Sequence, residues 1–467
     1  MQRMGGLGGR DLRRQALESS KTVSRKKRNK EEMQSRDSSA ANSRTHSTNV
    51  SRQGSDADDD DTSEGTNMSI ASLEDDLFSV GSEDADEDED SPEEWKVRLR
   101  DRMEEMKDRK RSSVQGRETT LASYGAILRS HFALDQIKSS SSELVNSMVK
   151  SIKMEASERE TCLALRALEA TILTLNSDSI YESVYSVLNV AYKDSESLAV
   201  KAAAINALGT AAVYGGASED ATSSIMDDLM EVIESDGSSV EAEDSAEVVV
   251  AAITAWANLA IDFEDMEDKT EEAMEVLVEQ LESTYAAVQI AAGQTIALLF
   301  EKSYSDDEDD YESPSDSDDD DPERHQNRIA SLKLYDAYRD RNQLIHILST
   351  LAKDSSKSVS KKDRVSVRSS FNDILLTVEE PTRGPGYRTH FGRGGTKALG
   401  SGIIVRIHQK GYLKINKWWK LERLQALKRI LGGGFLNHYE ANEMVFDSLP
   451  IMVAGSVEKS APRYRKQ

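Results

Sequence analysis

The stretch ALRALEATILTL, residues 164–175, repeats large apolar residues at helical spacing and fills the positions between them with small ones. Four more stretches share this character: LASYGAILRSHFAL (121–134), AAINALGTAAV (203–213), AAITAWANLAI (251–261) and IAAGQTIALLF (290–300). Their corresponding apolar residues, separated by 40, 40, 48 and 40 positions, are Leu128, Leu168, Leu208, Trp256 and Ile296. A period near 40 in helical sequence is typical of HEAT and armadillo repeats. We therefore predict an all-α fold, an armadillo/HEAT-like α-solenoid with these five residues in its core.

The rest of the chain is expected to fall into segments around this solenoid. Shorter helical stretches alternate with the five above, which predicts antiparallel helix pairs that stack. The acidic loop 235–245 accounts for the longer gap. The predicted layout is a disordered tail at 1–91, basic and then acidic; helical repeats at 92–301; an acidic disordered insert at 302–324; the last solenoid helices at 325–353; a linker and Gly/Arg loop at 354–402; a basic C-terminal module of helices and two short strands at 403–454; and a tail at 455–467.

Charge is distributed in blocks along the chain. The formal net charge is −25. Residues 1–50 carry 12 Lys and Arg against 5 Asp and Glu, whereas residues 51–94 carry 18 acids against one Arg. Residues 306–321 contain 11 acids, and residues 361–467 carry 20 basic residues against 9 acids. Blocks of like charge with few large apolar residues are typical of disordered interaction segments.

Composition also indicates a compartment. One cysteine, Cys162, allows no disulfide within the chain and no cysteine-based zinc site. No secretory signal or run of 18 apolar residues is visible. We expect a reducing compartment, the nucleus and/or the cytoplasm, and no membrane contact. The cluster KKRNK offers a candidate nuclear-import signal at Lys26, Lys27, Arg28 and Lys30, with a solvated basic patch as the alternative.

A basic helix near the C-terminus is the strongest candidate contact site for a partner or nucleic acid. It combines cations with two adjacent tryptophans, as phosphate-backbone binders do; its candidate residues are Lys414, Lys417, Trp418, Trp419, Lys420, Arg423, Lys428 and Arg429. A solvated basic face on a packing helix is the alternative. The preceding Gly/Arg loop adds Arg388 and Arg393 as possible RNA contacts, with a flexible connector as the alternative.

No pattern in the sequence indicates catalysis. The seven histidines are scattered, and neither H-E-x-x-H nor G-x-S-x-G is present. The Gly-rich loop does not fit a Walker A motif. We expect a non-enzymatic protein with no cofactor, no metal and no small-molecule substrate.

Several blocks resemble the interferon-related developmental regulator family. They are DRKRSSVQGRETTL (108–121), KKDRVSVRSSFNDIL (361–375), KINKWWKLERLQALKRILGGGF (414–435) and NHYEANEMVFDSLPIMV (437–453). The residues that carry the resemblance in the C-terminal blocks are Phe371, Asp373, Gly434, His438, Asn442, Glu443 and Phe446. The long acidic inserts make the chain similar to a fungal branch of the family.

This resemblance implies a regulatory scaffold with an armadillo-like fold. Members are transcriptional co-regulators that act through histone-deacetylase-type complexes, and some bind ribosomes. We therefore expect an adaptor in gene expression whose concave repeat surface binds a protein partner. One alternative is a ribosome-associated translation regulator that contacts rRNA through the basic helix, and a second is a transport or assembly chaperone for basic proteins. The sequence does not determine the partner or the oligomeric state.

Overall fold

The computed structural model describes residues 93–109, 112–263, 265–305, 332–353, 361–392, 395–401, 403–408 and 411–449. Four predictions therefore lie outside or almost entirely outside the described residues: the tail 1–91 with its import signal at Lys26, Lys27, Arg28 and Lys30, the acidic insert, the linker 354–360 and the tail 455–467.

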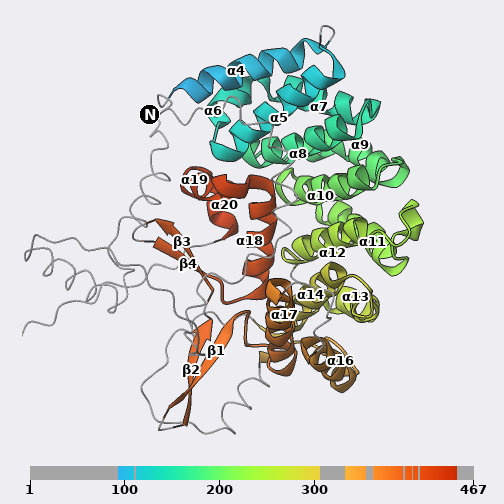
Figure 1. Cartoon of the computed structure of the whole chain (residues 1–467), viewed down its shortest axis with the longest axis vertical. Helices are drawn as coiled ribbons and strands as arrows, with labels where there is room; N and C mark the ends of the chain where they lie inside the picture. The colour runs from blue at the N-terminus through green and yellow to red at the C-terminus, as the bar shows by residue number, and fades with distance from the viewer. Residues whose placement is uncertain are drawn as a thin grey trace, which may run out of the picture. The chain divides into compact units, whose positions relative to one another are not determined.

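The described residues form an all-α solenoid of antiparallel helix pairs, as predicted. Each pair has one helix in an inner row and one in an outer row, and each inner helix packs on the next (Figure 1). The inner row is α5 (Val114–Ser130), α8 (Glu158–Leu175), α10 (Leu198–Tyr214), α12 (Ala246–Ala260), α14 (Ala286–Lys302) and α17 (Lys361–Glu379). The outer row is α4 (Glu94–Lys107), α7 (Ser141–Met154), α9 (Ile180–Asp194), α11 (Glu219–Glu234), α13 (Glu267–Gln280) and α16 (Arg341–Lys353), with α6 (Leu134–Ile137) and the 3-10 turn η3 (Lys138–Ser140) before α7.

The periodic residues of the sequence mark the inner row. Leu128, Leu168, Leu208, Trp256 and Ile296 lie one per helix on α5, α8, α10, α12 and α14, and each is at most 2% exposed. Small residues between them let the helices approach closely. A Cβ at Gly209 on α10 would lie 3.2 Å from the Cβ of Ala255 on α12. The inner row is therefore the core of the solenoid, because its residues contact neighbours on both sides.

Serine residues start most of the inner helices. The Ser113, Ser157, Ser197 and Ser245 hydroxyls accept the backbone N–H three residues later on α5, α8, α10 and α12. Such caps satisfy N–H groups that have no partner within the helix. The inner helices thus begin at positions fixed by local sequence.

Two irregular connections interrupt the repeat. The 235–245 loop contains the 3-10 turn η4 (Ser238–Val240) and turns on Gly237, where a side chain would overlap the Ala242 carbonyl. The acidic insert leaves the solenoid after α14 and returns through an antiparallel clasp. Ser305 donates its N–H to the Leu332 carbonyl at 2.7 Å, and Leu334 donates to the Ser303 carbonyl at 2.9 Å. Both ends of the insert are therefore held together at its base.

The segment 354–402, expected as a linker and loop, contains regular structure instead. Residues Lys361–Glu379 form the full helix α17, with Phe371, Ile374 and Val378 completely buried. Ile374 packs against Gly293 of α14 so closely that a side chain there would overlap it. Tyr387–Gly392 (β1) and Gly395–Ser401 (β2) pair as an antiparallel hairpin. The Ser- and Lys-rich start of α17 and the glycines of the hairpin are typical of connecting segments, so the sequence favoured a linker and a loop.

The two short strands expected after residue 402 are present as β3 (Ile404–His408) and β4 (Gly411–Lys414), which pair with each other. Residues 405–413 of this pair belong to a compact unit separate from the solenoid. The chain then forms α18 (Trp418–Leu431), the turn η6 (Gly432–Gly434), α19 (Phe435–Ala441) and α20 (Glu443–Ser448), which belong to the same compact unit as the repeats.

Candidate functional site

The basic C-terminal helix lies along the inner row. Helix α18 contacts α5, α8, α12 and α14, which belong to four different helix pairs (Figure 1). Its N-terminus meets the end of α14, and its C-terminus leads to η6 and α19 beside α5. The helix therefore runs opposite to the order of the repeats and connects the first pair to the later ones.

The N-terminus of α18 is held by a carboxylate. Glu301, at the end of α14, accepts the backbone N–H groups of Trp418 at 2.8 Å and Trp419 at 3.1 Å. The Trp418 indole donates to the Thr377 hydroxyl of α17 at 2.7 Å, and Trp418 is 1% exposed. A carboxylate at this end also interacts favourably with the helix dipole. Glu301 and Thr377 together fix where α18 begins.

Two arginines of α18 form ion pairs with the repeats. Arg423 donates to Asp262, which follows α12, at 2.6 Å. Arg429 donates to both oxygens of Glu169 on α8, at 2.6 and 3.0 Å, and to the Thr210 hydroxyl of α10. Burial lowers the pKa of Arg423, but the charge interactions and hydrogen bonds with Tyr214 and Asp262 are larger together, so the pKa is raised overall. The bidentate contact of Arg429 with Glu169 fixes the orientation of the two side chains as well as pairing their charges.

The predicted basic face is therefore directed largely into the protein. Lys420 and Arg423 are buried, and Arg429 is half-buried against Glu169; Lys414, Lys417 and Trp419 are also half-buried. Of the predicted set on α18, only Lys428 is exposed. Arg388 lies in β1, but its side chain is outside the described residues, as is Arg393. Packing and ion pairs with the repeats thus take up most of the predicted contact residues on α18. Helix α18 itself lies along the inner row.

The family-block residues after α18 attach the C-terminal helices to the first repeats. His438, fully buried, donates Nε2–H to the Leu128 carbonyl at 2.7 Å, and Asn442 donates to the Leu173 carbonyl at 2.9 Å. Burial lowers the pKa of His438 to about 4, so the ring is neutral near pH 7. A side chain at Gly434 would overlap the Arg129 carbonyl. These residues act as attachment points, and none contributes to a catalytic arrangement.

The remaining family-block residues have simpler places. Phe371 is fully buried on α17, and Asp373 accepts the Gly386 N–H at 3.2 Å. Phe446 is half-buried against Tyr439, and Glu443 is exposed at the start of α20. The sequence did not reveal two sets of acceptors. One is the carboxylates that bind α18, and the other is the backbone carbonyls that accept hydrogen bonds from His438 and Asn442.

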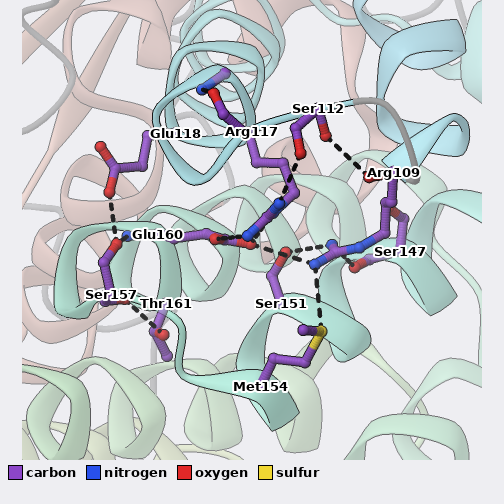
Figure 2. Close-up of polar contacts among 12 residues, drawn as sticks. Arg109, Ser112, Arg117, Glu118, Ser147, Ser151, Met154, Ser157, Glu160 and Thr161 are labelled. Atoms are coloured by element: carbon purple, nitrogen blue, oxygen red, sulfur yellow. Dashed lines mark hydrogen bonds and ion pairs between the residues drawn. The ribbon is translucent and has the colours of Figure 1, made fainter.

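A second buried charge network joins the first two helix pairs. Arg117 donates to both oxygens of Glu160, at 2.8 Å each, and Arg109 donates to the same carboxylate at 3.3 Å. Figure 2 shows both guanidinium groups pointing toward Glu160, with Ser151 beside Arg109. Burial alone would raise the pKa of Glu160, but the hydrogen bonds from Arg117 and Ser151 and the two positive charges lower it. The network attaches the segment between α4 and α5 to helices α7 and α8.

One buried carboxyl on α18 has no such partner, and this gives a pH prediction. Glu422 is 4% exposed, its Oε1 has no hydrogen-bond partner among the described residues, and burial raises its pKa from 4.5 to about 7. The folded state thus binds a proton that the unfolded state has lost, so stability falls as the pH rises from 4.5 through 7. We expect Glu422→Gln to raise the free energy of unfolding by about 3 kcal/mol at pH 8 and by less than about 1 kcal/mol at pH 5.

Urea unfolding of the full chain at pH 5, 6, 7 and 8 measures this difference. Glu440→Gln on α19 is the matched control, because Glu440 is exposed and the substitution is chemically identical. A Glu422→Gln effect that does not change with pH would show that the carboxyl does not take up a proton on folding.

The outer row presents a contrasting acidic surface. Residues 202–300 contain 21 Asp and Glu but a single basic residue, Lys269. Their exposed members on α11 and α13 are Glu219, Asp220, Asp227, Glu231, Glu234, Glu267, Asp268, Glu271, Glu272, Glu275 and Glu279. Lys269 forms an ion pair with Asp227 at 2.9 Å. The middle of the outer row is therefore strongly negative, which attracts cationic partners and repels polyanions.

The described residues contain neither a candidate metal-binding cluster nor a candidate membrane-spanning helix. No group of three or more His, Cys, Asp or Glu side chains in the described part of the chain could hold a metal ion. None of the helices described is both long and apolar enough to cross a membrane.

Comparison with known proteins identifies the family. Residues 62–379 match the family described as interferon-related developmental regulator, which covers more than half of the chain. The chain belongs to the interferon-related developmental regulator family. An uncharacterised protein of the yeast Schizosaccharomyces pombe is 27% identical over 381 residues, which span 81% of this chain and 77% of that protein. The interferon-related developmental regulator match includes the blocks at 108–121 and 361–375 and ends before α18. Membership supports a regulatory, non-enzymatic protein.

Proposed function

We propose that this protein is a non-catalytic adaptor in gene expression, a transcriptional co-regulator that binds a basic protein partner through its outer row. The observation that carries the proposal is the acidic surface of α11 and α13, where the described residues include eleven exposed carboxylates and one lysine. Such a surface speeds the association of a cationic partner with the solenoid. Exposed charges at the edge of an interface change mainly the rate of association, so the partner can also dissociate readily.

Family membership supports the regulatory part of this proposal. The arrangement of α18 supports a partner on the outer row, because the inner row is already covered by the chain itself. The solenoid then serves as a scaffold of fixed shape, with the C-terminal helices as an internal brace.

The ribosome-associated alternative receives less support from the described residues. Arg423 and Arg429, which would have to contact rRNA, are paired with Asp262 and Glu169. The acidic outer row would repel the phosphate backbone. The chaperone alternative rests on acidic tails that are outside the described residues.

Affinity capture from a cell extract at low and high salt tests the proposal. The bait is the full chain, compared with a triple variant, Glu231→Lys, Glu275→Lys and Glu279→Lys. We expect basic chromatin-regulatory proteins to be captured by the wild type at low salt and lost with the triple variant. The matched control changes three exposed acids of α4 with the same change of charge: Glu94→Lys, Asp101→Lys and Glu104→Lys.

Two outcomes would contradict the proposal. One is capture of the same partners by the wild type and the α11/α13 variant, which would place the interaction elsewhere. The other is salt-sensitive co-sedimentation with ribosomes and no chromatin-regulatory protein, which would favour the translation role.

A further inference from the structure

The last helix pair contains a hollow that the solenoid packing does not use. It has a volume of about 370 Å³ and lies between α16 and α17. Its lining residues are Ser349, Ala352, Lys353, Arg368, Asn372 and Leu375. Arg368, Asn372 and Leu375 follow one another at helical spacing on α17, so they form one face. Phe371, Ile374 and Val378 form the other face and are fully buried. The α17 face toward the hollow is exposed at Arg368 and Asn372 and half-buried at Leu375.

The hollow is lined by two cations and no acid. Lys353 and Arg368 are both exposed, and neither forms an ion pair or hydrogen bond with another described residue. Helix α16 has no acidic residue at all. Two positive charges therefore face a common space without a carboxylate between them, in contrast to Arg423 and Arg429, which are both neutralised.

We propose that this hollow binds a phosphoserine side chain of a partner protein. A phosphate monoester carries a charge of about −1.5 to −2 near pH 7, which matches the two cations better than a carboxylate does. Arg368 supplies a planar donor fork, which suits phosphate oxygens. Asn372 and Ser349 add neutral hydrogen-bonding groups to the lining. Ala352 and Leu375 line the hollow with apolar surface for a side chain next to the phosphoserine.

A single phosphate on a peptide fits this site better than a nucleic acid does. A polyanion gains affinity from several cations in a line, because each phosphate contact releases a counterion. Two of the residues that line the hollow are cations, and α17 ends in Glu379 followed by Glu380. The volume is that of a small-ligand pocket and can accept one or two side chains. This site is separate from the outer row, and the proposal does not depend on the proposed function.

Binding of defined peptide pools tests the proposal. The probe is a fluorescent pool of octapeptides with a central phosphoserine and randomised flanks, titrated with the full chain and followed by anisotropy. Matched pools carry serine or glutamate at the centre. We expect the phosphoserine pool to bind roughly tenfold or more tightly than either, and the difference to disappear in the double variant Lys353→Glu, Arg368→Glu.

The control variant makes the same change of charge elsewhere. Lys150→Glu with Lys153→Glu alters two exposed lysines of α7 and is expected to keep the preference for phosphoserine. Far-UV circular dichroism and urea midpoints check that both variants fold. Equal binding of the phosphoserine and serine pools would overturn the proposal, as would a preference that survives Lys353→Glu, Arg368→Glu. A glutamate pool that binds as tightly would overturn the choice of phosphate, and a 12-nucleotide RNA that binds more tightly through the same two residues would replace the peptide.

Discussion

Replacing Glu160 by Gln is expected to lower the free energy of unfolding by about 3 kcal/mol or more, since the loss of one partner leaves buried charge uncompensated. Glu160 is completely buried and receives hydrogen bonds from Arg109 and Arg117, whose side chains are 17% and 14% exposed. Gln can accept some of the hydrogen bonds from Arg109 and Arg117, but it cannot neutralise their positive charges. Urea unfolding at pH 7 measures the loss, and hydrogen exchange shows whether it is concentrated in α4 and α5.

The matched control is Glu143→Gln on α7. Glu143 pairs with Lys107 at 2.7 Å, but its side chain is 66% exposed, so we expect a change below about 0.5 kcal/mol. The pH dependence adds a second check. Because the pKa of Glu160 is lowered in the folded state, its contribution exists above the ordinary value of 4.5 and is lost as the pH falls. The Glu160→Gln effect should therefore shrink in acid. Equal effects of Glu160→Gln and Glu143→Gln would contradict the assigned role.

Replacing Arg429 by Met is expected to be nearly as costly, about 3 kcal/mol, because it leaves Glu169 buried without its cation. The Glu169 side chain is only 3% exposed. Without Arg429, its side-chain partner among the described residues would be the Thr210 hydroxyl, which donates to it at 2.8 Å. The double variant Arg429→Met, Glu169→Gln should recover most of the loss, since it removes both charges and leaves Gln to accept from Thr210. Thermal and urea unfolding of the single and double variants measure the coupling.

Lys153→Met provides the comparison for this pair, since Lys153 is an exposed lysine on α7 and its loss should change stability by less than about 0.5 kcal/mol. If Arg429→Met and the double variant were equally unstable, the damage would come from lost packing of the arginine stem and not from the unpaired carboxylate.

The repeated part of the fold was predictable because its signal is local. Leu128, Leu168, Leu208, Trp256 and Ile296 recur at a near-constant interval, and each helix must bury the same face against its neighbours. The spacing that identifies Leu168 as a core residue in α8 therefore also predicts the stacking of α8 on α10. The same local information gave β3 and β4, whose alternating pattern and short connection are readable in a few residues.

The position of α18 was not predictable for the opposite reason. A helix with Arg423 and Arg429 on it looks the same in the sequence whether it faces solvent or carboxylates. Its partners Asp262 and Glu169 belong to distant repeats and have no local feature that distinguishes them from other acids. The hairpin β1–β2 was missed because glycine disfavours strands, so Gly395 and Gly400 argued for a loop.

Because of the clasp between Ser303–Ser305 and Leu332–Leu334, the stability of the solenoid should depend little on the length of the segment inserted between them. Since these two antiparallel segments already hold the chain ends side by side, doubling the number of residues between them costs only about 0.6 kcal/mol of closure entropy. The junction is thus a natural graft point. A fluorescent protein or an epitope placed between residues 305 and 332 should leave the stacking of α14 on α17 undisturbed.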